Sequence, residues 1–403
     1  MPLEGVGLHG SPLEVFAAFL KLGLSSFGGP IAHIGYFRDE FVQRRHWLDE
    51  QAYADLVALC QFLPGPASSQ VGFSIGLMRA GYLGGIAAWA AFTLPSALLL
   101  VLFAYGAHRL TDPTGVALLH GLQLVAVAIV AQAVWGMAHA LCPDRQRSSI
   151  AIVAALIVLL IPSTVAQIAA IGLGAIVGLR VCRGVASVPV AGHLKSPVSP
   201  RVGFAALALY VLLLAGLRVL QILAPATGIA LFGAFYRSGA LVFGGGHVVL
   251  PLLREAFVTP GWVSDDAFLA GYGAAQAVPG PLFSFAAYLG SVVHATPHGV
   301  AGAALGLIGI FLPGMLILVA TLPFWDSLRR RPDARAAMAG VNASVVGLLG
   351  AALYNPLWTS AVRTPVDVGV ALVGFLLLTA WRVAPLYVVL VTATAAILAQ
   401  WVT

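Results

Sequence analysis

The sequence predicts an all-α polytopic membrane protein with two homologous helical repeats and broken or re-entrant helices. The first observation is composition: 60% of the 403 residues are hydrophobic and 9% are charged, with a mean hydropathy of +0.95, whereas soluble domains carry about 25% charged residues. The second is that runs such as IAIVAALIVLLI show no apolar–polar alternation, which favours membrane helices over a β-barrel. The third is an internal repeat.

Two short motifs occur twice in the same order. Phe-Gly-Gly stands at residues 27–29 and 243–245, and Pro-Gly-Pro stands at residues 64–66 and 279–281. Further residues match between the two copies, and these pairs are Lys21 and Arg237, Gly23 and Gly239, Arg38 and Arg254, Gln61 and Gln276, Ser69 and Ser284, Pro95 and Pro313, and Gly121 and Gly340. Because the order is preserved, each half is predicted to be one copy of a membrane unit.

Apolar segments follow one another along the chain, and each is expected to be helical. They lie at residues 12–27, 53–80, 81–107, 115–141, 149–161, 163–181, 203–224, 228–243, 266–295, 299–325, 334–357, 366–381 and 384–402. Two of them are interrupted by Pro-Gly-Pro. The polar stretch 182–202 is the predicted linker between a first repeat, residues 1–181, and residues 203–403, which hold an extra helix and the second repeat.

Basic loop residues indicate how the repeats are oriented. After the first apolar element, the first copy has Arg38, Arg44 and Arg45, whereas the second has only Arg254. After the third element the bias reverses, because the first copy has one arginine in this loop and the second has four. Under the positive-inside rule, this pattern predicts inverted repeats. In such transporters the substrate site lies at the repeat interface, near the membrane midplane.

The Pro-Gly-Pro motifs are expected to break their helices. Proline removes a backbone donor and pushes the preceding residue out of the helical region, so new helices would begin after Pro66 and Pro281. Their first amides carry partial positive charge and suit an anion. The alternative is a proline kink that serves packing, but two matched breaks favour function. We expect the two breaks to face each other across the repeat interface.

Consecutive glycines in the Phe-Gly-Gly motifs permit close backbone approach, or they mark plain helix ends. Lys21 and Arg237 each lie six residues before this motif in an apolar run. A cation inside a membrane helix is costly and usually faces a partner or a wet cavity. The hypothesis is that both supply positive charge to one site. Snorkelling of these side chains to the membrane surface is the alternative.

These features define the predicted substrate-binding residues. They are Lys21, Gly28, Gly29, His33, Gln61, Pro64, Gly65, Pro66, Ser68, Ser69, Arg237, Gly244, Gly245, Gln276, Pro279, Gly280, Pro281 and Ser284. The sequence contains no Walker A motif, no His-Glu-x-x-His motif, no nucleophile triad and no cysteine spacing typical of zinc sites, so we predict no enzymatic activity, cofactor or metal. Embedded cations with few embedded carboxylates point to an anionic substrate.

The stretches SFGGPIAHIGYFRDEFV and WLDEQAYADLVALCQFLPGPASSQVGFSIG, with the weaker copies VFGGGHVVLPLLREAFV and QAVPGPLFSFAAYLG, resemble the chromate transporter family in its long, two-domain form. The resemblance covers nearly the whole chain. The second copy departs from the pattern, because Gly246 replaces the proline of Phe-Gly-Gly-Pro. This departure leaves open whether both halves contribute equally.

The resemblance implies export of chromate from the cytoplasm across the bacterial inner membrane, driven by membrane potential or a proton gradient. Sulfate has the same shape and charge and is the natural competitor, so a sulfate or other oxyanion carrier is the alternative. A non-transporting membrane scaffold is an alternative of another class. The formal charge of +6 is more consistent with basic loops at the cytoplasmic face of a lipid bilayer than with binding of nucleic acid. The oligomeric state stays open, with a homodimer as one alternative.

Overall fold

The computed structural model describes residues 10–107, 112–161, 163–183, 196–223, 227–243, 246–328 and 330–400. Within these ranges the chain is helical and contains no strand, which confirms the all-α prediction. The helices of the first half are α1 (Pro12–Ser25), α2 (Gly29–Phe37), the π-helical turn η1 (Arg38–Arg44), α3 (Glu50–Phe62), α4 (Ala67–Ala107), α5 (Pro113–Leu141), α6 (Arg145–Leu160) and α7 (Thr164–Val181).

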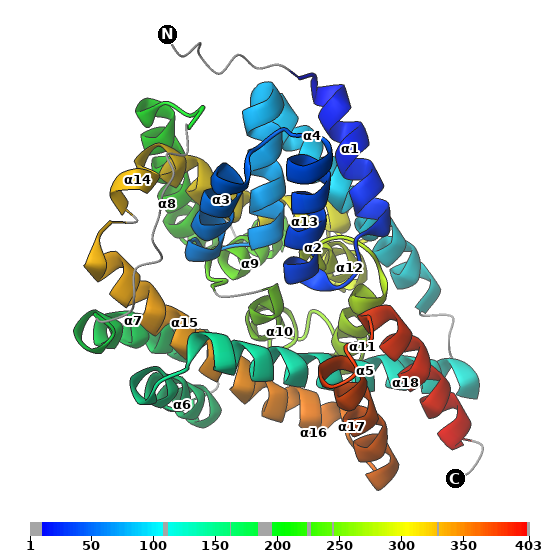
Figure 1. Ribbon diagram of the computed structural model, residues 1–403. Coiled ribbons are helices and arrows are strands. Elements are labelled where there is room, and N and C mark those ends of the chain that lie inside the picture. Colours follow the sequence, from blue (N-terminus) through cyan, green and yellow to red (C-terminus); the bar gives the residue numbers. More distant parts are fainter. Residues whose placement is uncertain are drawn as a thin grey trace, which may run out of the picture.

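The second half begins with α8 (Pro200–Leu223), which precedes α9 along the chain (Figure 1). It continues with α9 (Thr227–Ala240), η2 (Gly246–Val248), α10 (Val249–Phe257), α11 (Asp265–Ala277), η3 (Leu282–Ser284), α12 (Phe285–Val292), α13 (Gly299–Thr321), η4 (Leu322–Phe324), α14 (Trp325–Leu328), α15 (Pro332–Ala352), η5 (Leu353–Trp358), α16 (Thr359–Ala361), α17 (Pro365–Thr379) and α18 (Pro385–Gln400). Residues 184–195 of the predicted linker lie outside the described ranges.

The predicted breaks at both Pro-Gly-Pro motifs are confirmed. In the first half, α3 ends at Phe62 and α4 begins at Ala67, and in the second, α11 ends at Ala277 and η3 begins at Leu282. The predicted boundary between residues 80 and 81 is a kink inside α4, at Ala80 and Gly81. The short helices α2 and α10 were not predicted, because they lie outside the apolar segments that the sequence marks as helical.

The equivalent helices α3 and α11 begin in the same way. Asp49 accepts a hydrogen bond from the Ala52 amide (2.7 Å) to cap α3, and Ser264 accepts one from the Ala267 amide (3.2 Å) to cap α11. Both residues satisfy amides that the first helical turn leaves free. The repeated arginine also has a structural explanation, because Arg38 pairs with Glu50 and Arg254 pairs with Asp265 in these first turns.

The last two helices of each repeat pack on the other repeat. The hairpin of α6 and α7 packs on α15, whereas α17 and α18 pack on α5 (Figure 1). Small residues allow these close contacts: a methyl group on Gly340 would collide with the carbonyl of Gly174, and one on Gly121 would meet the backbone of Ala393. Such contacts between small residues are typical of membrane helices. The two repeats are therefore interlocked.

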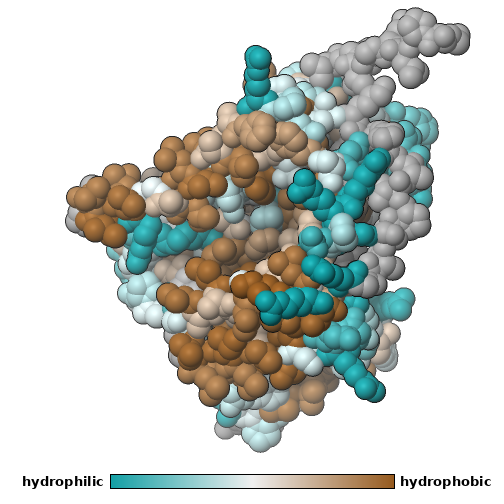
Figure 2. Space-filling model, turned by 90° about the vertical axis from the view of Figure 1, so that its left-hand side faces the viewer, coloured by the Kyte–Doolittle hydropathy of each residue, from teal (hydrophilic) through white to brown (hydrophobic). Residues whose placement is uncertain are grey.

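The surface is apolar in the way that a bilayer requires. Leu160 is 77% and Ile222 is 73% exposed, and Figure 2 shows apolar side chains spread over much of one side of the molecule. In the described part of the chain, five helical stretches are long and apolar enough to cross a membrane; they are Ala67–Ala107, Pro113–Leu141, Pro200–Leu223, Gly299–Leu328 and Pro332–Ala361. The chain is a multi-pass membrane protein.

Candidate functional site

Each Pro-Gly-Pro break is bound to the other repeat, next to the Phe-Gly-Gly motif. The Gly65 amide donates a hydrogen bond to the Val242 carbonyl (2.7 Å), and the Gly280 amide donates one to the Ser26 carbonyl (2.9 Å). Val242 and Ser26 both directly precede a Phe-Gly-Gly motif. Backbone that leaves a helix within a membrane needs such partners, and here each repeat supplies them to the other.

Glycine is required at the centre of both breaks. The φ angles of Gly65 and Gly280 are +120° and +100°, a region that side chains strongly disfavour. Space is also short: a Cβ atom on Gly65 would lie 2.9 Å from the Cα atom of Gly314, and one on Gly280 would lie 2.9 Å from Oγ of Ser96. Gly314 and Ser96 directly follow the matched prolines 313 and 95, so these contacts are equivalent as well.

This reciprocity means that a pseudo-two-fold rotation relates the repeats. A contact from part A of one repeat to part B of the other, repeated with the roles exchanged, arises only around a two-fold axis. Pro30 and Gly246 are equivalent positions, and a Cβ atom on Gly246 would lie 3.2 Å from Cγ of Pro30. Equivalent residues that touch lie at the axis. The departure from Phe-Gly-Gly-Pro in the second copy therefore makes room for the proline of the first.

Different side chains fasten the two breaks. Nε2 of Gln70 donates to the carbonyl of Pro64 (2.9 Å) and, across the repeat interface, to the carbonyl of Gly314 (2.8 Å). At the second break, the hydroxyl of Ser284 lies 2.6 Å from that of Ser96, also across the interface, and donates to the carbonyl of Pro281 (2.7 Å). One repeat uses an amide and the other uses a pair of hydroxyls.

Buried hydroxyl groups that have no hydrogen-bond partner among the described residues lie beside the breaks. They belong to Ser26, Ser69 and Thr93, which are at most 2% exposed. His33 is fully buried nearby, with Nε2 at 3.2 Å from the Ser26 carbonyl and Nδ1 at 3.4 Å from Oγ of Ser68. An unpaired buried hydroxyl costs free energy, so these groups are suited to bind a ligand that accepts hydrogen bonds.

The other predicted residues occupy varied positions. Gly28 and Gly29 have positive φ angles, and Gly28 precedes α2 as an N-cap without a side-chain hydrogen bond. Gln61 is exposed at the end of α3, whereas Gln276 is partly buried and its Nε2 bonds to no described residue. Gly244 and Gly245 lie outside the described residues.

The structure does not join the two predicted cations to the breaks through any side-chain hydrogen bond or ion pair of the described residues. Nζ of Lys21 lies 3.7 Å from Oε2 of Glu40, a buried carboxylate that also pairs with Arg44 and Arg45. Nη1 of Arg237 is buried and has no hydrogen-bond partner in the part of the chain that the structure describes, and it lies beside Gly233, one turn back along α9. Whether the cations bind substrate stays a prediction.

The equivalent of Glu40 in the second repeat is Ala256, so Arg237 lacks the carboxylate that Lys21 has. Three cations share one carboxylate in the first repeat, and that cluster keeps an excess of positive charge. In the second half, Arg218 of helix α8 adds a further cation near Arg237. Both repeats therefore carry positive charge at equivalent places, although by different means.

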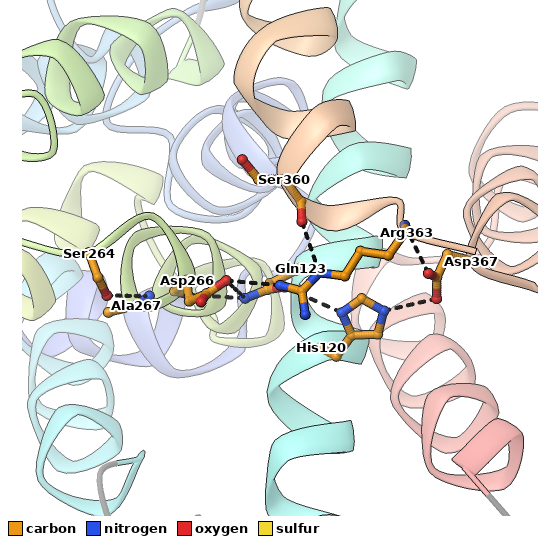
Figure 3. A network of polar contacts seen from close by, with 8 residues as sticks. All are labelled: His120, Gln123, Ser264, Asp266, Ala267, Ser360, Arg363 and Asp367. Atoms are coloured by element: carbon orange, nitrogen blue, oxygen red, sulfur yellow. Dashed lines mark hydrogen bonds and ion pairs between the residues drawn. The ribbon is translucent and has the colours of Figure 1, made fainter. Parts of the chain in front are cut away.

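A polar network ties α5 to α11 and α17 (Figure 3). Nε2 of Gln123 donates to Oδ1 of Asp266 (3.1 Å), which also accepts from Arg363 (3.2 Å). His120 lies 3.4 Å from Gln123 and 2.8 Å from Asp367. The equivalents of His120 and Asp266 in the other repeat are Ala339 and Gln51, neither of which carries a charge. The network thus holds only one of the two break-bearing helices.

Sequence reasoning missed several residues of this site, namely Ser26, Glu40, Gln70, Thr93 and Ser96. Gln70 and Ser96 do not match between the repeats, because Phe285 and Gly314 stand at the equivalent positions, and matching residues were the main signal. Glu40 lies in a charged stretch that pointed to a membrane surface. Ser96 directly follows the matched Pro95 and was within reach of the same reasoning.

The family model described as Chromate transporter matches this chain in two segments, residues 13–179 and 229–398. The chain belongs to the chromate transporter family. This confirms the resemblance seen in the sequence, and the two matched segments agree with the repeat. Helix α8 lies between these segments. The proposed division at residues 182–202 stays a prediction.

Curated relatives of the chain carry names that refer to transport. A chromate transport protein of Pseudomonas aeruginosa is 31% identical over 92% of this chain and 87% of its own length. A probable chromate transport protein of Synechococcus elongatus is 28% identical over 83% and 82%, and a chromate transport protein of Cupriavidus metallidurans is 25% identical over 88% and 84%. No solved structure matches the chain significantly.

Proposed function

We propose that this protein is a secondary transporter that exports chromate from the cytoplasm across the bacterial inner membrane, driven by the membrane potential or the proton gradient. The observation that carries the proposal is the reciprocal docking of the two broken helices, beside buried hydroxyls that lack partners. Membership of the chromate transporter family supports the substrate. The names of the relatives support a transporter rather than an enzyme.

The proposed site lies at the repeat interface, between the two breaks. Chromate is a tetrahedral dianion, so its removal from water is costly unless hydrogen-bond donors replace the lost solvent. The first amides of α4 and η3, which follow Pro66 and Pro281, supply donors and the positive ends of helix dipoles. The hydroxyls of Ser26, Ser69 and Thr93 supply further donors. The remaining predicted residues shape the two breaks around the anion.

Lys21 and Arg237 contribute positive potential in this proposal. Neither side chain hydrogen-bonds to a described residue of the breaks. The two cations would therefore attract the dianion through their charge, without being part of the breaks themselves. We expect Lys21→Gln to reduce chromate transport while the protein stays in the membrane, and Arg237→Gln to reduce it less. Wild-type transport by Lys21→Gln would instead favour a membrane anchor. Ala256→Glu supplies the missing carboxylate and should reproduce the effect of Arg237→Gln.

The direction of transport follows from charge. One elementary charge that crosses 100 mV changes the free energy by about 2.3 kcal/mol, so a dianion that leaves a negative interior gains about twice that amount. Export therefore needs no ATP. Alternating access follows if the pseudo-two-fold axis lies in the membrane plane, because the two breaks then open to opposite sides in turn. Tags on equivalent loops that are accessible from the same side would contradict this inverted arrangement.

Sulfate is the second candidate substrate. The proposed donors are amides and hydroxyls, which recognise the charge and shape of a tetrahedral oxyanion and do not depend on the central atom. We expect excess sulfate to compete with chromate for transport. Competition at equal concentrations would favour a general oxyanion carrier, whereas a need for large excess would favour chromate.

Uptake of chromate by inside-out vesicles tests the function directly. We expect uptake that requires the imposed membrane potential or proton gradient and saturates with chromate. Ser69→Ala should raise the KM about 10- to 150-fold, since a hydrogen bond to a charged group contributes about 1.5–3 kcal/mol. Ser74→Ala is the matched control, because its buried hydroxyl lies on the same helix beyond the first turn. A protein in the membrane without any flux would be a scaffold.

A further inference from the structure

An elongated groove lies between α6, α7 and α15, away from the proposed chromate site. Its volume is about 330 Å³. Gln146 and Ser149 line it near the start of α6, and Val153 and Ile157 continue along the helix. Apart from these first two residues and Ser344, the lining is apolar. The groove is thus polar at one end and apolar along its length.

The length of the groove corresponds to one leaflet of a bilayer. It follows α6 from Gln146 to Ile157, which at 1.5 Å per residue is about 17 Å. The hydrocarbon core of a bilayer is about 30 Å thick, so the groove is roughly as long as half of it. Val153 is 47% exposed, which means that the groove is open to the side, where lipid surrounds the protein.

The polar end of the groove carries an excess of positive charge. Arg147 pairs with Asp144 (2.6 Å), and Arg183 pairs with Asp333 (3.4 Å). The backbone amide and guanidinium of Arg147 hold the pKa of Asp144 below its ordinary value. This carboxylate is therefore charged at neutral pH and balances the charge of Arg147. Two further arginines, Arg145 and Arg180, flank the same end and pair with no carboxylate of the described residues.

Figure 2 shows the side of the molecule that carries α6 and α7, where apolar side chains cover broad areas with hydrophilic side chains at their borders. In a bilayer any apolar groove is covered by lipid tails, so the tails alone give little selectivity. Selectivity comes from the charged end, because basic pockets between membrane helices bind anionic headgroups.

We propose that this groove is a binding site for an anionic phospholipid, with one acyl chain along α6 and α7 and the phosphate at Arg145 and Arg180. The polar side chains of Gln146 and Ser149 lie at the depth of the ester groups. Because α6 and α7 belong to the first repeat and α15 to the second, the lipid bridges the interlocked repeats. Its binding therefore stabilises the hairpin of α6 and α7 in its place on α15.

The test uses the purified full-length protein in a neutral detergent, with phosphatidylglycerol or phosphatidylcholine added to the micelles. Retained lipid is counted by native mass spectrometry, and thermal unfolding is followed in parallel. We expect phosphatidylglycerol to be retained and to raise the Tm, and phosphatidylcholine to do neither. Equal retention and equal stabilisation by both lipids would overturn the proposal.

Two variants locate the site. Arg145→Gln with Arg180→Gln should weaken phosphatidylglycerol binding about 30-fold, because each arginine near the surface contributes about 1 kcal/mol. The matched control is Arg201→Gln with Arg382→Gln, which removes the same charge from two exposed positions outside the groove. Val153→Trp fills the groove and should abolish retention without loss of arginine. Wild-type binding by either groove variant, or equal losses in the control, would contradict the proposal.

Discussion

The two Pro-Gly-Pro breaks share one backbone arrangement and differ in the side chains that fasten it. At the first break, Nε2 of Gln70 joins the carbonyls of Pro64 and Gly314 across the interface. At the second, Ser284 and Ser96 meet through their hydroxyls. A glycine amide nevertheless makes the same hydrogen bond to the opposite repeat at both breaks.

This difference shows what the architecture requires. The backbone hydrogen bond and the glycine are present in both copies because unpaired backbone within a membrane is costly. The side-chain hydrogen bonds to the break differ, because different buried donors can reach its carbonyls. Gln70 is the more rigid solution, since one amide nitrogen holds two carbonyls. The hydroxyl pair leaves the second break with a weaker link between the repeats, and the network of Figure 3 supports the helix that precedes it.

The strongest test of this interlocked arrangement divides the chain within residues 184–195. Neither half alone should transport chromate or resist proteolysis, because each lacks the hairpin that covers α5 or α15 and the partner of its break. The two halves expressed together should restore flux in inside-out vesicles. Transport by one half alone would show that a single repeat forms a complete site without the break of the other repeat.

Alanine at the central glycines compares the two breaks directly. Gly65→Ala and Gly280→Ala each force a side chain into a disfavoured region, at a cost of order 1–3 kcal/mol. Gly65→Ala should be the more damaging, because its new methyl group meets the Gly314 backbone, which cannot rotate away. We expect loss of transport and a lower Tm.

The second break offers a rescue that the first does not. The methyl group of Gly280→Ala meets the hydroxyl of Ser96, so adding Ser96→Gly should recover part of the lost Tm. Equal damage at both breaks, with no recovery in the double variant, would mean that the backbone angle alone sets the cost. Both variants are measured by thermal unfolding of the purified protein.

The sequence predicts the repeat, the breaks and most helix boundaries because these depend on local chemistry. Proline and glycine interrupt an apolar run wherever they stand, as after Phe62 and Ala277. The packing of α6 and α7 on the second repeat, and of α17 and α18 on the first, depends on which helix faces meet. The sequence does not predict this packing, because almost every helix face in a membrane protein is apolar. The pairing of Lys21 with Glu40 was likewise hidden, since the two residues lie on different elements and only the lysine has a charged equivalent.

Alanine substitutions of Gln70 and Ser284 compare how much each side chain stabilises its break. Gln70→Ala leaves the carbonyls of Pro64 and Gly314 without this donor, so we expect a loss of about 1–3 kcal/mol in unfolding free energy. Ser284→Ala removes one hydroxyl and should cost about 1 kcal/mol. Thermal unfolding should therefore rank Gln70→Ala below Ser284→Ala in Tm. The reverse order would indicate that the hydroxyl pair, and not the amide, carries the link between the repeats.

The smallest expected effect concerns the network around Asp266 in Figure 3. This carboxylate lies in the first turn of α11 and accepts hydrogen bonds from Gln123 and Arg363, whereas Gln51 stands at the equivalent position of α3. The side chain of Asp266 is 69% exposed, so its ion pair contributes well under about 1 kcal/mol. Asp266→Asn should leave the Tm nearly unchanged.

The effect of Asp266→Asn is expected to be local, because the network holds one end of α11 while the other end leads into the second break. Hydrogen exchange followed by mass spectrometry should show faster exchange at the start of α11 and no change in α3. Gln51→Ala is the matched control, since it alters the equivalent position without breaking an ion pair of the described residues. If exchange rises equally in α3 and α11, the repeats open together and the network gives the second break no separate support.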